Sequence, residues 1–180
     1  MHNKVVYHAM KALNAPEFGL GFPVLRFNFR GTGLSEGEYD GKAETGDVLA
    51  ALAWLENEYN RPLIVVGFSF GAAISLLACC PQSPASPCRH NIRAIAALGL
   101  PTRAEGHQYR YSFLSQCTIP KLFVSGDGDG FAPVADLNHV AATTAEPKKL
   151  VLIPGADHFF AGQLDAMQNT LASWCKEQLP

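Results

Sequence analysis

The chain has 180 residues, of which 48% are hydrophobic and 17% are charged, with a formal net charge of -2. This composition is typical of a compact globular protein and excludes an intrinsically disordered chain. Lysine and arginine are scattered, so the sequence predicts no basic surface for nucleic acid or anionic lipid. No apolar stretch reaches transmembrane length. We expect a single domain over residues 1–180, located in the cytoplasm, with no nucleic-acid or membrane partner.

The cysteines are odd in number and irregularly spaced. They are Cys79, Cys80, Cys88, Cys117 and Cys175. An odd number cannot all pair within one chain, and the cysteines near His90 lack the paired short spacing of structural zinc motifs. We therefore expect reduced, mostly buried thiols in a reducing compartment, and no metal site.

Apolar periodicity predicts helices and strands that alternate along the chain. The predicted helices cover residues 4–14, 43–59, 70–79, 134–145 and 161–178. The predicted strands cover residues 23–29, 62–68, 92–99, 120–126 and 148–154. Near-continuous apolar strands between helices are typical of a parallel sheet that is covered on both faces. We expect a three-layer α/β sandwich with a mostly parallel sheet, whose ligand site lies beyond the carboxyl ends of the strands.

Residues 67–71 read Gly-Phe-Ser-Phe-Gly and stand between a predicted strand and a predicted helix. In that context a G-x-S-x-G motif holds its serine on a tight turn, with the hydroxyl raised above the sheet. Ser69 is therefore a candidate nucleophile, and the backbone N–H of Phe70 is a candidate oxyanion-hole donor. The alternative is that Ser69 is a small residue in an ordinary strand-to-helix turn.

A serine nucleophile needs a base, and the base needs an orienting acid. The loop after the last predicted strand reads Gly-Ala-Asp-His-Phe-Phe and offers His158, whereas His139 falls inside a predicted helix. The loop after the preceding strand offers Asp127 and Asp129, which the residues alone do not separate. Asp157 shares a turn with His158 and is expected to hold local structure.

Two other interpretations of the glycine-rich loops are not supported. The Asp-Gly-Asp-Gly string is no EF-hand, because Phe131 and Asn138 stand where calcium ligands belong. The glycines of Gly-Thr-Gly-Leu-Ser-Glu-Gly are spaced one residue too far apart for a dinucleotide fingerprint. We expect Arg30 and Ser35 to support this loop, and we expect no cofactor.

The segments GFSFG, GDGDGFAP and GADHFF, in that order, resemble the α/β-hydrolase superfamily, as does FNFRGTGLSEG. From about residue 4 to its end, the chain is similar to small bacterial serine hydrolases without a large lid. In that group the strand is followed by G-x-x-D-x-x-x-P, which Gly126, Asp129 and Pro133 match. The resemblance implies that Asp129 is the acid, and that the protein hydrolyses small carboxylic esters through an acyl-enzyme.

The resemblance also implies a strand and a loop that would precede the first predicted helix. In the family that loop supplies the second oxyanion-hole donor, and the strand lies between those predicted at 23–29 and 62–68. The fold is therefore expected to lack its N-terminal strands, and we hypothesise that Met1 is an internal methionine. Alternatively, the two flanking strands close up, or a partner chain fills the gap.

About twenty residues separate the strands predicted at 92–99 and 120–126, which is too few for a helical lid. An open site favours a small-molecule ester as the substrate, and the sequence leaves a homodimer open. The candidate substrate-binding residues are Phe68, Tyr111, Phe131 and Phe159, with the alternative that such aromatics form core. Two functional alternatives stay open: a thioesterase or acyltransferase that uses the same residues, and a non-catalytic binding module.

Overall fold

The structure is a computed structural model that describes residues 3–80, 89–104 and 107–179. A parallel sheet has the strand order β1–β2–β5–β6. Its strands are β1 (Leu63–Phe68), β2 (Ile92–Leu98), β5 (Lys121–Gly126) and β6 (Lys148–Ile153). The helices are α1 (Lys4–Asn14), α2 (Glu44–Tyr59), α3 (Phe70–Cys79), α4 (Val134–Thr143) and α5 (Leu164–Glu177). Smaller elements are the 3-10 helices η1 (Pro16–Phe18) and η2 (Ser112–Gln116), and the antiparallel pair β3 (Arg103–Ala104) and β4 (His107–Gln108).

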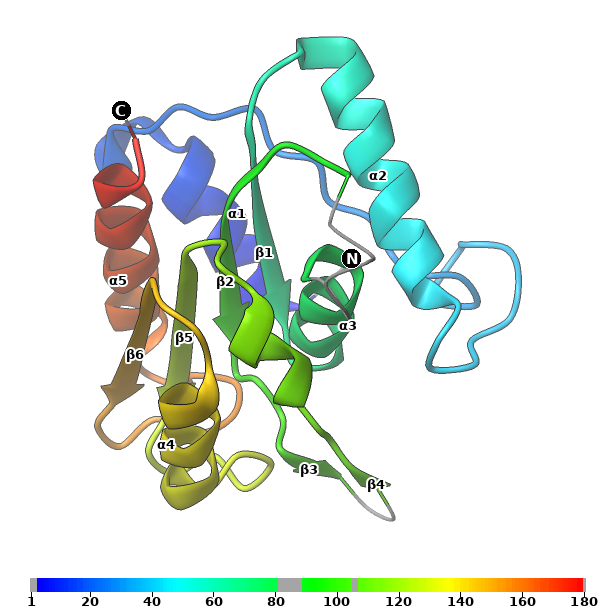
Figure 1. Cartoon of the computed structure of the whole chain (residues 1–180). Helices are drawn as coiled ribbons and strands as arrows, with labels where there is room; N and C mark the ends of the chain where they lie inside the picture. The colour runs from blue at the N-terminus through cyan, green and yellow to red at the C-terminus, as the bar shows by residue number, and fades with distance from the viewer. Residues whose placement is uncertain (1–2, 81–88, 105–106, 180) are drawn as a thin grey trace.

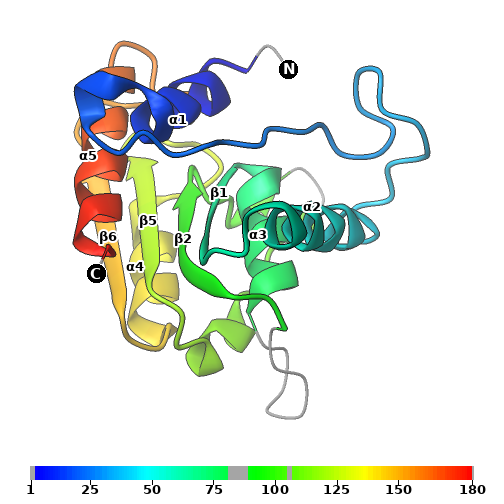
Figure 2. The ribbon, with the colours of Figure 1, turned by 90° about the horizontal axis from the view of Figure 1, so that it is seen from above.

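The elements form three layers. Helices α1 and α5 cover one face of the parallel sheet, and α2, α3 and α4 lie on the other (Figures 1 and 2). All four strands of this sheet point the same way, so the loops that follow them gather at one edge of the sheet. This three-layer α/β sandwich with a parallel sheet is the fold class that the sequence predicts.

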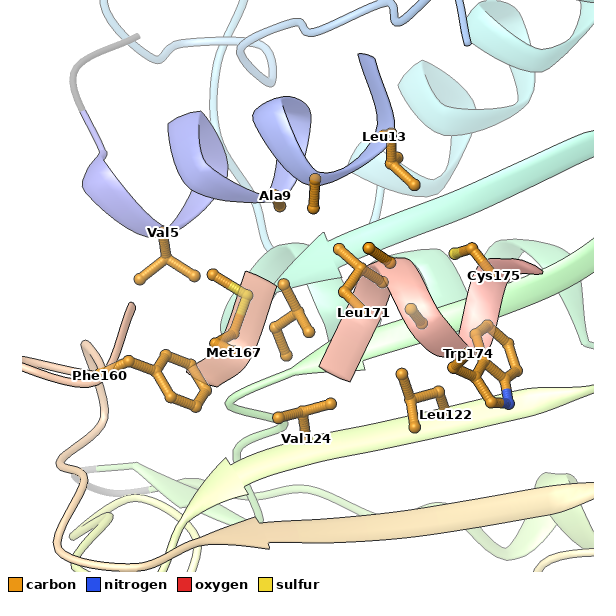
Figure 3. Packing of buried hydrophobic residues seen from close by; sticks show 14 of the residues in the cluster. Val5, Ala9, Leu13, Leu122, Val124, Phe160, Met167, Leu171, Trp174 and Cys175 are labelled. Carbon is orange, nitrogen blue, oxygen red and sulfur yellow. The ribbon is translucent and has the colours of Figure 1, made fainter. Parts of the chain in front are cut away.

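The core on the α1 and α5 face is formed by close packing of small and large side chains. Val5, near the start of α1, lies beside Phe160 and Met167, while Leu13 lies toward the other end of α5 (Figure 3). Phe160, in the loop after β6, is fully buried. Helix α1 therefore begins at the edge where the strands end and runs back along the sheet.

The core on the opposite face joins α2 and α3 to the sheet, and it contains a cross-link that we did not expect. Cys80, after α3, forms a disulfide with Cys117, after η2. The two Cα atoms are 5.3 Å apart, within the usual range for a disulfide. The expectation of reduced thiols is therefore wrong for this pair, because the fold brings two distant cysteines together. Cys88 lies outside the described residues.

The predicted helices and four of the five predicted strands are confirmed, but the strand predicted at 23–29 is wrong. Residues 21–27 do alternate between exposed and half-buried, which is the period of a strand. However, this segment pairs with no strand in the described part of the chain. An alternating pattern becomes a strand only when a neighbour accepts its hydrogen bonds.

None of the helices within the described ranges combines the length and apolar character that a membrane crossing requires.

Candidate active site

Ser69 sits on a sharp turn between β1 and α3. Its backbone has φ 53° and ψ −125°, a strained conformation for a residue other than glycine. Its N–H donates to the carbonyl of Leu98 at 2.9 Å, which ties the turn to β2. A Cβ on Gly67 would stand 2.5 Å from the Gly71 oxygen and 2.6 Å from the Ala72 Cα. Glycine at position 67 is therefore what lets α3 start so close to β1.

The loops after β5 and β6 bring a carboxylate and an imidazole to this serine. The Nε2 of His158 lies 2.9 Å from the Oγ of Ser69. The Nδ1 of His158 lies 2.8 Å from the Oδ2 of Asp129. Both His158 and Asp129 are buried. The three side chains thus form one continuous chain of hydrogen bonds that runs from the protein interior to the hydroxyl.

Close backbone contacts hold those two loops together. A Cβ on Gly126 would stand 2.0 Å from the carbonyl oxygen of Ala156, so only glycine fits there. The same oxygen accepts from the N–H of Gly128 at 3.0 Å. The Oδ1 of Asp127 accepts from the N–H of Gly155 at 2.7 Å. These contacts fix the distance between the loops and therefore the distance between the Asp129 carboxylate and the His158 imidazole.

The structure also separates the three carboxylates that the sequence offers. Asp127 is exposed and bonds the neighbouring loop, as described above. Asp157 is exposed, and its Oδ1 accepts from the N–H groups of Phe159 and Ala161 at 3.0 and 2.9 Å. Only Asp129 of the three bonds His158, which is the assignment that the family resemblance implies.

The surroundings of Asp129 favour its ionised form. Burial opposes the charge, but hydrogen bonds from His158, the Phe131 N–H and Ser125 outweigh burial and lower the pKa of Asp129 below its usual value. The Phe131 N–H donates at 2.8 Å and the Ser125 hydroxyl at 3.2 Å. A carboxylate that stays charged can orient the imidazole and stabilise its protonated form.

The N–H of Phe70 is a donor at the start of α3, where backbone N–H groups have no partner within the helix. Among the described residues, none accepts a hydrogen bond from it. The Phe70 ring packs against Phe29 and Tyr39, with centroid distances of 5.7 and 5.1 Å. This packing connects α3 to the segment that follows η1.

Three aromatic rings surround His158. The ring centroids of Phe131, Phe68 and Phe159 lie 4.6, 5.1 and 5.2 Å from that of the imidazole. Phe131 and Phe159 are 44% and 55% exposed, so they present apolar surface at the mouth of the site. The structure corrects the prediction that Tyr111 binds substrate. Tyr111 is buried in the core, and its hydroxyl donates to the carbonyl of Pro101 at 2.6 Å.

Two residues of the site were not anticipated. Gly99, directly after β2, has φ 53°, and a Cβ there would stand 3.0 Å from the Phe68 ring and 3.3 Å from the His158 ring. The sequence signal for Gly99 was its position: it is a glycine at the end of a predicted strand, at the edge of the sheet where the candidate site lies. Ser125 has a weaker signal, a polar residue at the end of a buried strand, and its bond to Asp129 appears only in three dimensions.

The glycine-rich loop after residue 29 is supported as the sequence predicts. Arg30 pairs with Asp47 of α2, with Nη2 and Oδ1 2.6 Å apart. The Ser35 hydroxyl donates to the carbonyl of Asn28 at 3.1 Å. The loop is thus attached to α2 and to itself by side chains.

Comparison with known proteins agrees with this geometry. Residues 6–177 match the family model for the alpha/beta hydrolase domain, and the chain belongs to this family. An uncharacterized protein of Rickettsia prowazekii is 36% identical over 168 residues, which cover 89% of this chain and 66% of that protein. The chain spans no more than about two thirds of the curated relatives that it matches.

Solved structures are similar over nearly the whole chain. An alpha-beta serine hydrolase homologue from Coxiella burnetii has a TM-score of 0.78 at 33% identity, covering 96% of this chain and 76% of its own. A serine hydrolase without a lid from Xanthomonas campestris has a TM-score of 0.78 at 29% identity, covering 100% and 76%. The chain is therefore similar to lidless bacterial serine hydrolases.

Proposed function

We propose that this protein is a serine-dependent hydrolase of small carboxylic esters that works through an acyl-enzyme. The observation that carries the proposal is the hydrogen-bond chain from Asp129 through His158 to Ser69. In this arrangement each group has the partner that its role requires: the nucleophile has a base, and the base has an acid.

In the proposed reaction, the Oγ of Ser69 attacks the ester carbonyl while the Nε2 of His158 takes its proton. The Phe70 N–H donates to the oxygen that becomes negative. His158 then gives the proton to the leaving alcohol, and the acyl group stays on Ser69. Water then attacks the acyl-enzyme while His158 takes a proton from it. His158 returns this proton to the Oγ of Ser69 as the carboxylic acid leaves. Asp129 holds the imidazole with its N–H toward the carboxylate.

The preference for small esters follows from the mouth of the site. Exposed rings of Phe131 and Phe159 flank His158, and the short connection after β2 leaves little chain to build a cover. Apolar contact of this limited extent suits a short acyl group better than a long lipid chain.

A fluorophosphonate probe tests the proposal, because it reacts with a serine that is activated by a base. We expect the wild-type chain to be labelled, Ser69→Ala to be unlabelled and His158→Ala to be labelled at least a hundredfold more slowly. His139→Ala, an exposed histidine on α4, is the matched control and should be labelled at the wild-type rate. Labelling that survives in Ser69→Ala would contradict the assignment of the nucleophile.

Ester preference is then measured with p-nitrophenyl esters from acetate upward. We expect kcat/KM to be highest for the shortest acyl groups and to fall as the chain lengthens. A folded chain that neither reacts with the probe nor hydrolyses any ester of the series would favour the non-catalytic binding module.

A further inference from the structure

The loop that carries Asp129 is held only weakly by its own backbone. Asp129 stands between Gly128 and Gly130, and glycine restricts the backbone less than any other residue. Within the loop, the N–H of Asp129 donates to the carbonyl of Gly126 at 3.3 Å, and the N–H of Ala132 donates to the carbonyl of Asp129 at the same distance. Both bonds are longer than is usual between N–H and oxygen. The position of the carboxylate therefore depends on contacts with other segments.

On the carboxyl side of Asp129, the loop is held by two residues that follow β2. The backbone N–H groups of Thr102 and Arg103 both donate to the carbonyl of Phe131, at 2.9 and 3.1 Å. These residues stand at the start of the β3–β4 pair, which projects beyond the ends of the parallel strands (Figure 1). Phe131 is thus the point at which a second segment holds the loop of Asp129.

Phe131 contacts both the acid and the base. Its N–H donates to the Oδ1 of Asp129 at 2.8 Å, and its ring centroid lies 4.6 Å from that of His158. A shift of this residue would move its N–H away from the carboxylate and its ring away from the imidazole. A displacement of about 1 Å in a catalytic site can lower the rate about a hundredfold. The bonds to the carbonyl of Phe131 therefore matter for the geometry of the site.

Asp136, in the first turn of α4, fixes the two residues that hold Phe131. Its Oδ2 accepts from the hydroxyl of Thr102 at 3.0 Å and from the Nη2 of Arg103 at 2.9 Å. Thr102 is buried, so few other partners can reach its hydroxyl. The bonds from Arg103 and then from Thr102 lower the pKa of Asp136 below its usual value, and the carboxylate stays charged at neutral pH. One carboxylate oxygen thus connects α4 to the segment that holds Phe131.

An aspartate in the first turn of a helix also has a simpler explanation, a favourable interaction with the helix dipole. Asp165 has the same place in α5, the helix that follows the loop of His158, and it is exposed. The bonds of Asp136 instead lead out of its own helix, to Thr102 and Arg103. Asp165 therefore serves as the comparison that separates an effect of the helix dipole from an effect on Phe131.

We propose that Asp136 and Thr102 are positioning residues for Asp129: they fix the carbonyl of Phe131, and the N–H of Phe131 is thereby held against the carboxylate. The inference rests on the proposed function and deepens it, because it adds to the three catalytic side chains the residues that keep the acid in place. Its effect on the bond between Asp129 and His158 can be measured without substrate.

The first experiment measures that bond by proton NMR. A proton in a short hydrogen bond to a charged acceptor gives a signal far downfield of the backbone amides. We expect the wild type to show this signal for the Nδ1 proton of His158, and Asp129→Asn to lose it, which assigns the signal. At the same pH the signal should move upfield in Asp136→Ala and stay in place in Asp165→Ala.

The second experiment measures the hydrolysis of p-nitrophenyl acetate. Asp136→Ala should lower kcat about tenfold and change KM less than about twofold, because a positioning residue acts on the transition state and not on substrate binding. Asp136→Asn keeps an oxygen that accepts from Thr102, so its kcat should recover to within about threefold of the wild type. Asp165→Ala should keep both constants. The side chain of Asp136 is 40% exposed, so these variants should fold.

Thr102→Val tests the path from Asp136 to Phe131 with the shape of the side chain retained. Alone it should lower kcat about threefold, since the bond between Arg103 and Asp136 remains. Combined with Asp136→Ala, it should lower kcat no further, because both changes break the same path. A double variant in which the two losses multiply would contradict a shared path through Phe131.

Three further outcomes would overturn the proposal. A rise in KM with kcat unchanged would make Asp136 a substrate contact, in the polar pocket that it lines with Gln108 and Tyr109. Equal losses in Asp136→Ala and Asp165→Ala would assign the effect to charge at the start of a helix. An unchanged His158 signal in Asp136→Ala would show that Asp129 keeps its position without Asp136.

Failure of the proposed function gives a different result. A wild type that shows the His158 signal but neither reacts with a fluorophosphonate nor hydrolyses the ester would reject the hydrolase, and an upfield shift in Asp136→Ala would still support the positioning role. Labelling of the wild type, with the signal and kcat unchanged in Asp136→Ala, would do the reverse. A wild type with neither signal nor activity would reject both, because Asp129 would not be held against His158.

Discussion

The two sides of the catalytic edge are held in different ways. The loops after β5 and β6 are joined by backbone contacts, such as the N–H of Gly128 bonding the carbonyl of Ala156. The segment 22–43 has one backbone bond to α1, from the N–H of Phe22 to the carbonyl of Leu13, and is otherwise held to the rest chiefly by side chains such as Arg30 and Asp47. On this second side Glu44 is fully buried, and its Oε2 has no hydrogen-bond partner in the described ranges.

This difference distinguishes the side of the site that backbone hydrogen bonds fix from the side that they do not. Where strands pair and loops bond each other's backbone, the acid and the base are fixed to within hydrogen-bonding distance of their partners. On the other side, residues 22–29 pair with no strand in the described ranges, an apolar groove lies between this segment and β1, and the Oε2 of Glu44 has no partner within the same ranges. The following predictions test this contrast, from the largest expected effect to the smallest.

The largest effect is expected at the acid. Asp129→Asn keeps the shape of the side chain but removes the charge that orients His158, so the rate of ester hydrolysis or probe labelling should fall about 10⁴-fold. Asp127→Asn is the matched control on the same loop: its amide Oδ1 can still accept from the N–H of Gly155, so the rate should stay within about threefold of the wild type. Equal losses in the two variants would mean that the loop, and not the carboxylate of Asp129, determines the rate.

A stability effect is expected where the two loops meet. Gly126→Ala would place a Cβ against the carbonyl oxygen of Ala156, so the free energy of unfolding should fall by about 3 kcal/mol. Gly130→Ala, in the same loop with nothing within 4 Å of its Cβ, should change it by less than about 0.5 kcal/mol. Urea denaturation of both variants measures the difference. A loss of less than about 1 kcal/mol in Gly126→Ala would show that the backbone of these loops shifts as readily as that of the segment 22–43.

A pH effect is expected at the opposite end of β5. Burial lowers the pKa of Lys121 to about 8, and its Nζ donates to the carbonyls of Cys117 and Ile119. The unfolded chain holds this proton to a higher pH, so the free energy of unfolding should rise between pH 8 and about 10.5. The gain is on the order of 3 kcal/mol at most.

Lys121→Met isolates that contribution from the other groups that titrate in this range. Its free energy of unfolding should not show this rise. The stability of the wild type relative to the variant should therefore increase with pH. A constant difference between the two proteins across this window would contradict a lowered pKa in the folded state.

The smallest effect on the whole molecule is expected on the side held by side chains. Asp47→Ala removes the acceptor of the Arg30 backbone N–H and of its guanidinium, so hydrogen exchange in residues 22–43 should speed up. Exchange in β5 and β6 should stay unchanged, because no backbone pairing is lost there. Asp165→Ala, an exposed residue of α5, is the control. Faster exchange throughout would show that the two sides are coupled.

Much of this architecture is readable from local patterns. The apolar periods locate the helices α1 to α5 and the four strands of the parallel sheet, and the motif around Ser69 is a strand-to-helix turn as its glycines indicate. Ser69, an aspartate and His158 follow three strands in the order that a serine, acid and base would take, and the choice of Asp129 over Asp127 came from the family resemblance. Each helix, strand and turn in this set is defined by residues that lie close together in sequence.

The remaining features depend on contacts between distant residues, and only the tertiary structure decided them. The sequence by itself determined a parallel α/β sandwich and placed the candidate residues Ser69 and His158 at one edge of its sheet, because periodicity and turns are local. The disulfide between Cys80 and Cys117, the burial of Tyr111 and the unpaired state of residues 23–29 are set by which segments meet in space. An extended segment becomes a strand only when a neighbour accepts its hydrogen bonds, and residues 23–29 pair with no strand in the described ranges.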